Sequence, residues 1–114
     1  MQNKTVDEMS DYVIDEMCNF FGKRVKDFVV KDIVEDANHK SFIIEFNAYD
    51  YFPVIFNYDM GRIGCSIIFG IKTIELKNSQ KWWEEAELNK FFKELKYELE
   101  IRIPDKYLIA CGWM

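Results

Sequence analysis

Glycine and histidine are scarce in this chain, which has five glycines and one histidine among its 114 residues. A phosphate-binding loop needs closely spaced glycines before a helix, and no such arrangement occurs. His39 follows Asp36 in a short polar turn, without a cysteine or carboxylate at the spacing of a metal site. We therefore expect a protein with no enzymatic activity and no nucleotide, cofactor or metal.

The three cysteines, Cys18, Cys65 and Cys111, are odd in number and far apart, and they include no Cys-x-x-Cys pair. This spacing predicts neither a disulfide framework nor a zinc site. Apolar neighbours predict thiols that are buried and unreactive. Free thiols, together with an N-terminal segment that leads into a charged helix, favour a cytoplasmic location.

No apolar run approaches the roughly 20 residues that span a membrane. The net charge of -5 also opposes binding to phosphate backbones or anionic lipids, so neither nucleic acid nor membrane is an expected partner. Residues 1–59 contain twelve acids and six bases, whereas residues 60–114 contain eight acids and nine bases. This asymmetry favours a basic protein partner, and an acidic, solvated surface is the alternative explanation.

The segment from Ser41 to Leu76 holds most of the β-branched and aromatic residues, in runs too short for buried helices. It is therefore expected to form the central sheet. The expected strands are residues 25–35, with an irregularity near Lys31 and Asp32; 40–49; 51–58, with Pro53 at an edge or entry; 63–76, with a bulge or bend at Gly64 and Gly70; and 97–103, where polar and apolar residues alternate.

Three helices are expected around this sheet. Thr5 and Glu8 form a capping box that begins a helix over residues 5–21. A second helix begins at Asn78 or Ser79 and carries Leu88, Phe91, Phe92 and Leu95 on its buried side, and a short helix follows Pro104. The result is one α+β domain, residues 1–114, with the order α-β-β-β-β-α-β-α and an antiparallel sheet of about five strands whose helices lie on one face.

The first helix has an unusual outer face. Asp7, Asp11 and Asp15 recur every four residues, Glu16 lies beside them, and residues 5–22 contain no base. Like charges at this spacing destabilise a helix by a few tenths of a kcal/mol per pair. The acidic residues therefore favour contact with a basic partner, and the alternative is that they only aid solubility.

Two aromatic clusters, Tyr49–Phe52 and Trp82–Trp83, are further candidates, because Tyr and Trp dominate binding hot spots. Core burial is the alternative, although neighbouring residues on a strand cannot all face inwards. Asp50 and Asp59 are paired carboxylates that would suit acid–base chemistry in a shared cleft, and turn formation explains both equally well.

A small acidic α+β domain with an acidic helix face, outward-facing aromatics and no catalytic motif resembles the immunity proteins of bacterial toxin systems, including those of contact-dependent growth inhibition. The resemblance implies tight binding to a cognate toxin domain, often a basic nuclease, whose active site or exosite is blocked. The residues expected to bind it are Asp7, Asp11, Asp15, Glu16, Tyr49, Asp50, Tyr51, Asp59, Trp82 and Trp83. The alternative is an adaptor, or a domain that binds a small apolar ligand between the sheet and the second helix.

Overall fold

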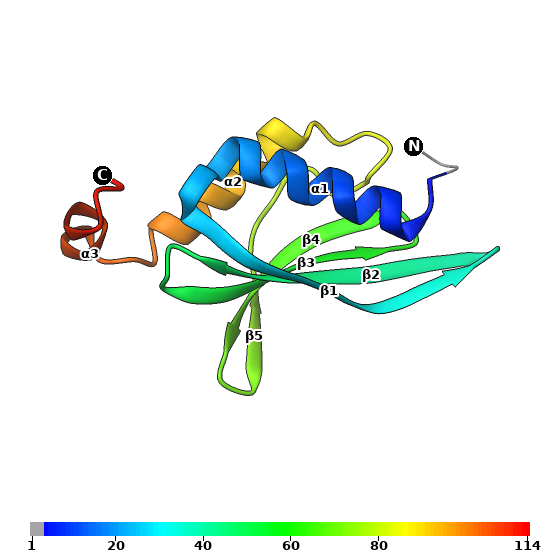
Figure 1. Cartoon of the computed structure of the whole chain (residues 1–114), viewed down its shortest axis with the longest axis horizontal. Helices are drawn as coiled ribbons and strands as arrows, with labels where there is room; N and C mark the ends of the chain where they lie inside the picture. The colour runs from blue at the N-terminus through cyan, green and yellow to red at the C-terminus, as the bar shows by residue number, and fades with distance from the viewer. Residues whose placement is uncertain (1–3) are drawn as a thin grey trace.

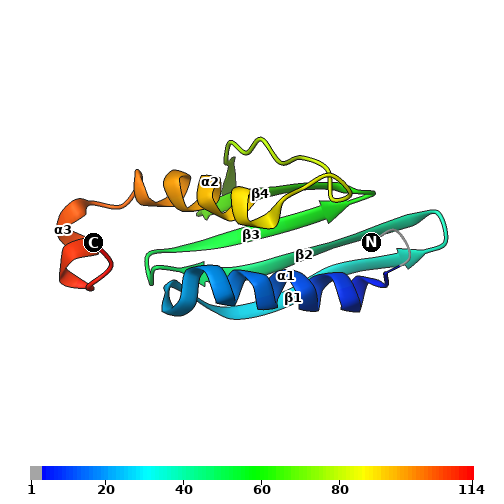
Figure 2. The same cartoon turned by 90° about the horizontal axis from the view of Figure 1, so that it is seen from above.

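A computed structural model describes residues 4–114 as a five-stranded antiparallel sheet with two long helices on one face (Figures 1 and 2). The strands lie in sequence order, β1-β2-β3-β4-β5, and the domain is α+β as expected. The elements are α1 (Val6–Phe21), a 3-10 turn (Gly22–Arg24), β1 (Val25–Asp36), β2 (His39–Ala48), β3 (Phe52–Asp59), β4 (Arg62–Phe69), β5 (Lys72–Glu75), α2 (Leu88–Glu100) and α3 (Asp105–Ala110). None of the helices in this part of the chain is long and apolar enough to cross a bilayer.

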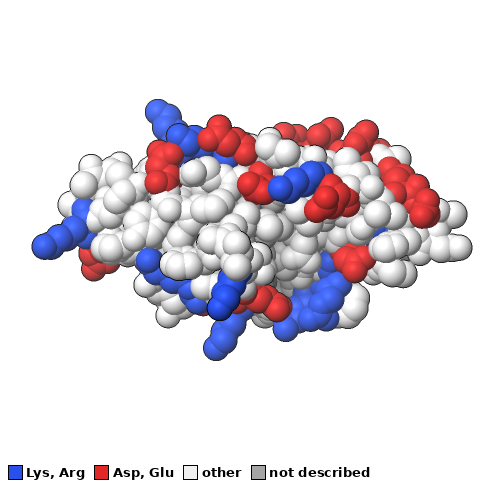
Figure 3. Space-filling view, turned by 90° about the horizontal axis from the view of Figure 1, so that it is seen from below, with Lys and Arg blue, Asp and Glu red and all other residues white. Residues whose placement is uncertain are grey.

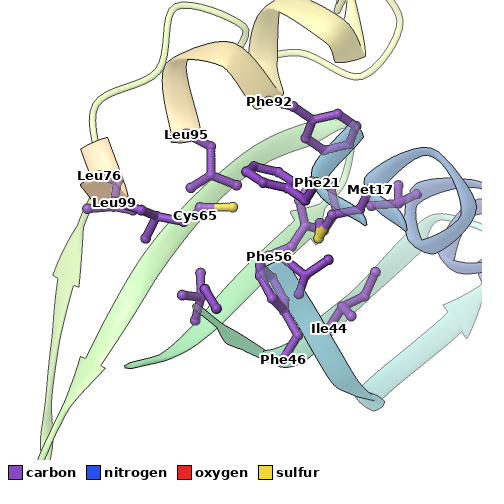
Figure 4. Packing of buried hydrophobic residues seen from close by; sticks show 14 of the residues in the cluster. Met17, Phe21, Ile44, Phe46, Phe56, Cys65, Leu76, Phe92, Leu95 and Leu99 are labelled. Carbon is purple, nitrogen blue, oxygen red and sulfur yellow. The ribbon is translucent and has the colours of Figure 1, made fainter. Parts of the chain in front are cut away.

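The sheet buries alternate residues beneath the helices, as the period-two pattern requires. Ile44 of β2 pairs with Phe56 of β3, and both side chains are fully buried. From above, α1 brings Phe21 and α2 brings Phe92 into the same cluster, with ring centroids 5.9 Å apart (Figure 4). These aromatic contacts join both helices to the sheet and to each other.

The N-terminal end of α1 has the expected capping box. The Glu8 amide donates to the Thr5 hydroxyl at 3.1 Å, and the Thr5 amide donates to the Glu8 carboxylate at 3.0 Å. The bond from the Thr5 backbone lowers the pKa of Glu8, because it stabilises the ionised carboxylate. The expected helix start is confirmed.

The irregularity expected in β1 is also confirmed. The pairing with β2 shifts between Lys31 and Val34, where Asp32 has a φ of +54°, and a second shift follows Lys26, where Asp27 has a φ of +60°. Aspartate tolerates this left-handed backbone better than most side chains do. Both positions are bulges on an edge strand.

The prediction of a strand over residues 97–103 is wrong, because α2 continues through Glu100. Leu95, Leu99 and Ile103 are buried at four-residue steps, which is the period of a helix. Tyr97 and Ile101 produced the apparent alternation, but they are 64% and 56% exposed. The alternating pattern therefore came from apolar side chains that do not reach the core.

The fifth strand lies earlier in the chain than expected. Instead of one strand over residues 63–76, β4 and β5 form a hairpin that turns at Gly70, whose φ is +65°. Figure 1 shows this hairpin projecting away from the helices. Gly70 thus marks a complete reversal of the chain rather than a bend. Pro53 is the second residue of β3, which confirms strand entry but at a central strand rather than an edge.

The second helix begins eight or nine residues later than expected, because its N-cap is Glu87 rather than Asn78 or Ser79. The intervening segment instead binds the β3–β4 end of the sheet. The Ile63 amide donates to the Lys81 carbonyl at 2.9 Å, and the Trp83 amide donates to the Gly61 carbonyl at 2.8 Å. Asn78 caps no helix, because its side chain donates to the carbonyl of Phe91.

Three residues, Tyr49, Asp50 and Tyr51, connect β2 to β3, and the first two have φ values of +62° and +51°. The Tyr51 amide closes the turn on the Ala48 carbonyl at 3.0 Å. Tyr49 is fully buried, and its hydroxyl donates to the Glu100 carboxylate at the end of α2. Burial, followed by this hydrogen bond, raises the pKa of Tyr49.

The expectation that all three cysteines are buried holds only for Cys65. Cys18 lies on the outer side of α1, beside the buried Met17, and Cys111 follows α3 at the exposed C-terminal end. An apolar neighbour in the sequence does not bury a helical residue, because adjacent positions point in different directions. Burial raises the pKa of the Cys65 thiol.

Thiol modification should therefore distinguish the three cysteines. In native protein, Cys18 and Cys111 are expected to react promptly with a disulfide reagent, whereas Cys65 should react only after denaturation, because its thiolate is disfavoured and inaccessible. The absorbance of the thiolate released from the reagent measures both the prompt reaction and the reaction after denaturation. The Cys65→Ala variant should keep the prompt phase unchanged, and three promptly reactive thiols would contradict the described burial.

Removing the Tyr49 hydroxyl should weaken the whole fold. Tyr49→Phe removes the buried hydroxyl that donates to the half-buried Glu100 carboxylate, which keeps its ion pair with Lys96, and the expected loss is about 1–3 kcal/mol in the free energy of unfolding. Urea denaturation measures the change. Tyr97→Phe is the matched control, since Tyr97 is 64% exposed, and equal effects of the two variants would show that the Tyr49 bond contributes nothing.

Candidate protein-binding surface

The acidic stripe, defined as Asp7, Asp11, Asp15 and Glu16, lies on the side of α1 that faces away from the sheet. The first three side chains are exposed and Glu16 is half-buried. Five core residues at steps of three and four fix this orientation: Val6, Met9, Val13, Met17 and Phe21. Because the apolar side of α1 is held by the sheet and α2, the helix cannot turn the acidic stripe inwards.

None of the ion pairs in residues 4–114 involves the acidic stripe. The six that occur join Lys26 to Asp50, Lys31 to Glu45, His39 to Asp59, Lys40 to Glu35, Lys96 to Glu100 and Arg102 to Glu98. The carboxylates of the acidic stripe thus lack the cation partners that Asp50, Glu45, Asp59, Glu35, Glu100 and Glu98 have. Their mutual repulsion is not offset within the described part of the protein.

A small hollow of about 300 Å³ lies where the acidic stripe meets the start of α2. It is lined by Tyr12, Glu16, Glu87, Leu88 and Asn89. Tyr12 is 39% exposed, and its ring packs edge-on against Trp83 with centroids 6.1 Å apart. Two carboxylates beside an aromatic ring are the groups that bind a lysine or arginine side chain.

Tyr12 and Glu87 were not among the residues expected from the sequence. A signal for Tyr12 was present, because it lies four residues before Glu16 and is not part of the apolar series on α1. Glu87 gave no such signal, because α2 was expected to begin before it. Only the position of that helix start brings Glu87 next to α1.

The expectation that Tyr49 and Trp83 contact a partner at the surface is wrong, because these side chains are 0% and 5% exposed. Tyr49 is held inside by the bond to Glu100, and Trp83 by its packing against Tyr12 and Tyr58. Tyr51 and Trp82 remain exposed, at 41% and 49%. In the adjacent pairs Tyr49–Asp50 and Trp82–Trp83, one residue therefore faces the core and the other faces outwards.

The exposed residues expected at the site do not form one cluster. Asp50 and Tyr51 lie at the β2–β3 turn, whereas Asp59 ends β3 at the opposite side of the sheet. Asp50 pairs with Lys26 at 2.6 Å and Asp59 with His39 at 2.9 Å. The two carboxylates therefore share no cleft, and the acid–base arrangement considered from the sequence is wrong.

Many acidic and basic side chains lie on opposite long edges of the molecule. In Figure 3, which views the uncovered face of the sheet, acidic side chains gather along one long edge and many Lys and Arg side chains along the other. The edge strand β1 carries Asp27, Asp32, Glu35 and Asp36. It lies beneath α1, so these acids extend the negative potential of the acidic stripe.

Side chains fill the space between the sheet and α2, where an apolar pocket was expected. Phe91, Phe92 and Leu95 are at most 1% exposed, and they fill the space with direct contacts to Phe56 and Phe21. Close packing of this kind leaves no room for a ligand. The position expected for a small apolar ligand is therefore occupied by core side chains.

Within residues 4–114, no three side chains of His, Cys, Asp or Glu converge in a way that would hold a metal ion. No protein-family model, curated protein or solved structure matches the chain. On the surface of the protein, the acidic stripe with its neighbouring hollow is the feature that packing leaves unexplained.

The loss of folding stability caused by repulsion within the acidic stripe can be measured directly. Asp11→Asn and Asp15→Asn should each raise the free energy of unfolding by about 0.2–0.5 kcal/mol at low salt, because each removes repulsion between carboxylates. Asp7→Asn is the matched control, since the helix dipole favours an acid in the first turn. Chemical denaturation with and without added salt checks the result. A loss of stability in the first two variants would show that these carboxylates are satisfied within the fold.

Proposed function

We propose that this protein is an immunity protein that binds and neutralises a basic bacterial toxin domain through the acidic stripe of α1 and the adjoining hollow. The proposal is supported by the carboxylates of Asp11 and Asp15, which form no ion pair within residues 4–114. They lie in the middle of a helix, beyond the favourable effect of its N-terminal dipole. Their repulsion is a cost that a cationic partner would remove.

The two parts of the surface suit different stages of binding. Exposed carboxylates at the acidic stripe raise the local potential and accelerate encounter with a basic protein. Tyr12 adds a rigid aromatic surface, and Glu16 and Glu87 flank the hollow beside it. A lysine or arginine of the partner, seated in this hollow, would form the desolvated contact that slows dissociation.

Neutralisation would follow from charge complementarity. A nuclease active site presents basic groups to a phosphate backbone, and an acidic helix face can occupy the same groups. The protein would then act by stoichiometric blockade and would need no catalytic residues. An adaptor with a basic partner would use the same surface, so the experiment must test toxicity as well as binding.

Co-expression tests the function. Immunity genes adjoin toxin genes, so the upstream reading frame is expected to encode a large secreted protein, whose basic C-terminal domain is the partner to express. We expect this domain to be lethal alone, harmless with the present protein, and co-purified with it at nanomolar affinity, as about 1,200–2,000 Å² of buried surface allows. Co-purification without toxicity would instead support an adaptor, and the absence of any complex would refute the proposal.

Association kinetics test the surface. Asp11→Lys with Asp15→Lys should slow association with the basic domain severalfold at low salt, and the deficit should shrink as salt screens the charges. Glu75→Lys with Asp105→Lys makes the same change in net charge on β5 and α3, away from the acidic stripe. If both double variants slow association equally, net charge rather than the acidic stripe governs the encounter.

A further inference from the structure

A second pocket, of about 510 Å³, lies on the face of the sheet that the helices leave uncovered. Asn57, Gly64 and Ser66 form its floor, at strand positions that alternate with buried residues. The segment from Glu75 to Lys81 forms a wall. This segment is fixed at both ends, because the Leu76 amide donates to Cys65 and the Lys81 carbonyl accepts from Ile63, both at 2.9 Å.

The charge of this pocket is opposite to that of the protein. Arg62, Lys77 and Lys81 line it together with one acid, Glu75, in a protein whose net charge is -5. None of these three bases takes part in the ion pairs described for residues 4–114. The guanidinium of Arg62 is instead supported by the ring of Trp82, 5.6 Å from the centroid. A concave site focuses such a field.

Gly64 provides a second, independent observation. Its backbone is not in the left-handed region, and an added Cβ would meet only the side-chain oxygen of Asn57, at an ordinary contact distance of 3.5 Å. Neither backbone geometry nor packing therefore requires glycine here. Glycine within a strand weakens the sheet, and it often marks a place where a ligand approaches the backbone closely.

We propose that this pocket binds a small multivalent anion, with Gly64 leaving the floor open and Arg62, Lys77 and Lys81 supplying the positive charge. Ammonium and guanidinium groups bind phosphate and carboxylate oxygens through charge-assisted hydrogen bonds. The side chains of Asn57 and Ser66 offer further donors from the floor. The volume lies in the range of small-molecule sites, about 300–1,000 Å³. This site is separate from the acidic stripe and does not depend on the proposed function.

Calorimetric titration with pyrophosphate and with citrate, at low ionic strength, tests the site. Saturable one-to-one binding is expected, and Lys77→Gln with Lys81→Gln should weaken it at least about tenfold, because two charge-assisted contacts are lost. Lys90→Gln with Lys106→Gln is the control, since it changes net charge equally on α2 and α3 and leaves the pocket intact. Preference for pyrophosphate would identify a phosphate-bearing ligand, and preference for citrate a polycarboxylate.

The Gly64→Val variant tests whether anion binding can be lost while the stability of the fold is kept. A valine side chain suits a strand and would fill the floor, so the melting temperature should be retained or raised while anion binding is lost. The proposal is overturned if neither anion binds, if the control pair weakens binding as much as the pocket pair does, or if Gly64→Val retains wild-type affinity.

Discussion

The tight turn at Tyr49 and Asp50 is the constraint on which the remaining structure depends. It sets the register of β2 against β3, one of the two inner pairings of the sheet. A slip of one residue would carry Phe42, Ile44 and Phe46 from the helix side of the sheet to the open side. A tyrosine in a left-handed conformation is costly, and this one is retained because its ring is buried and its hydroxyl is bonded to Glu100. The Tyr49 ring also packs edge-on against Trp113, with centroids 5.3 Å apart, so one side chain joins the turn, the end of α2 and the C-terminal segment.

The fold class followed from local patterns that coincide with burial. Short β-rich runs between turn residues gave four of the five strands, and the capping box gave the start of α1. The errors arose where an apolar residue does not enter the core. Tyr97 and Ile101 are exposed on α2, yet in the sequence they cannot be distinguished from strand residues. Trp82 and Trp83 resembled the first turn of a helix, although hydrogen bonds to the β3–β4 end fix them in an irregular segment.

The candidate surface was only partly predictable for a similar reason. Charge on a helix can be assigned to a face from spacing alone, so Asp7, Asp11 and Asp15 were correctly expected to lie outwards. The lack of ion pairs to them within the described residues, and the hollow beside Tyr12, depend on how the rest of the chain packs around α1. The pocket around Gly64 depends likewise on a long-range crossing by the segment that follows β5. Neither arrangement has a local signature in the sequence.

The bulges in β1 have a consequence for self-association. An edge strand presents unpaired amides and carbonyls to any other strand, and proteins commonly block such edges with bulges and charges. Asp27 and Asp32 do both, since each disturbs the ladder and each projects a carboxylate. The other edge, β5, has only four residues and is regular, with Ile71 of the adjoining turn fully exposed. A chain that recruits an extra strand, from a second copy or during aggregation, would therefore do so beside β5 and leave α1 accessible.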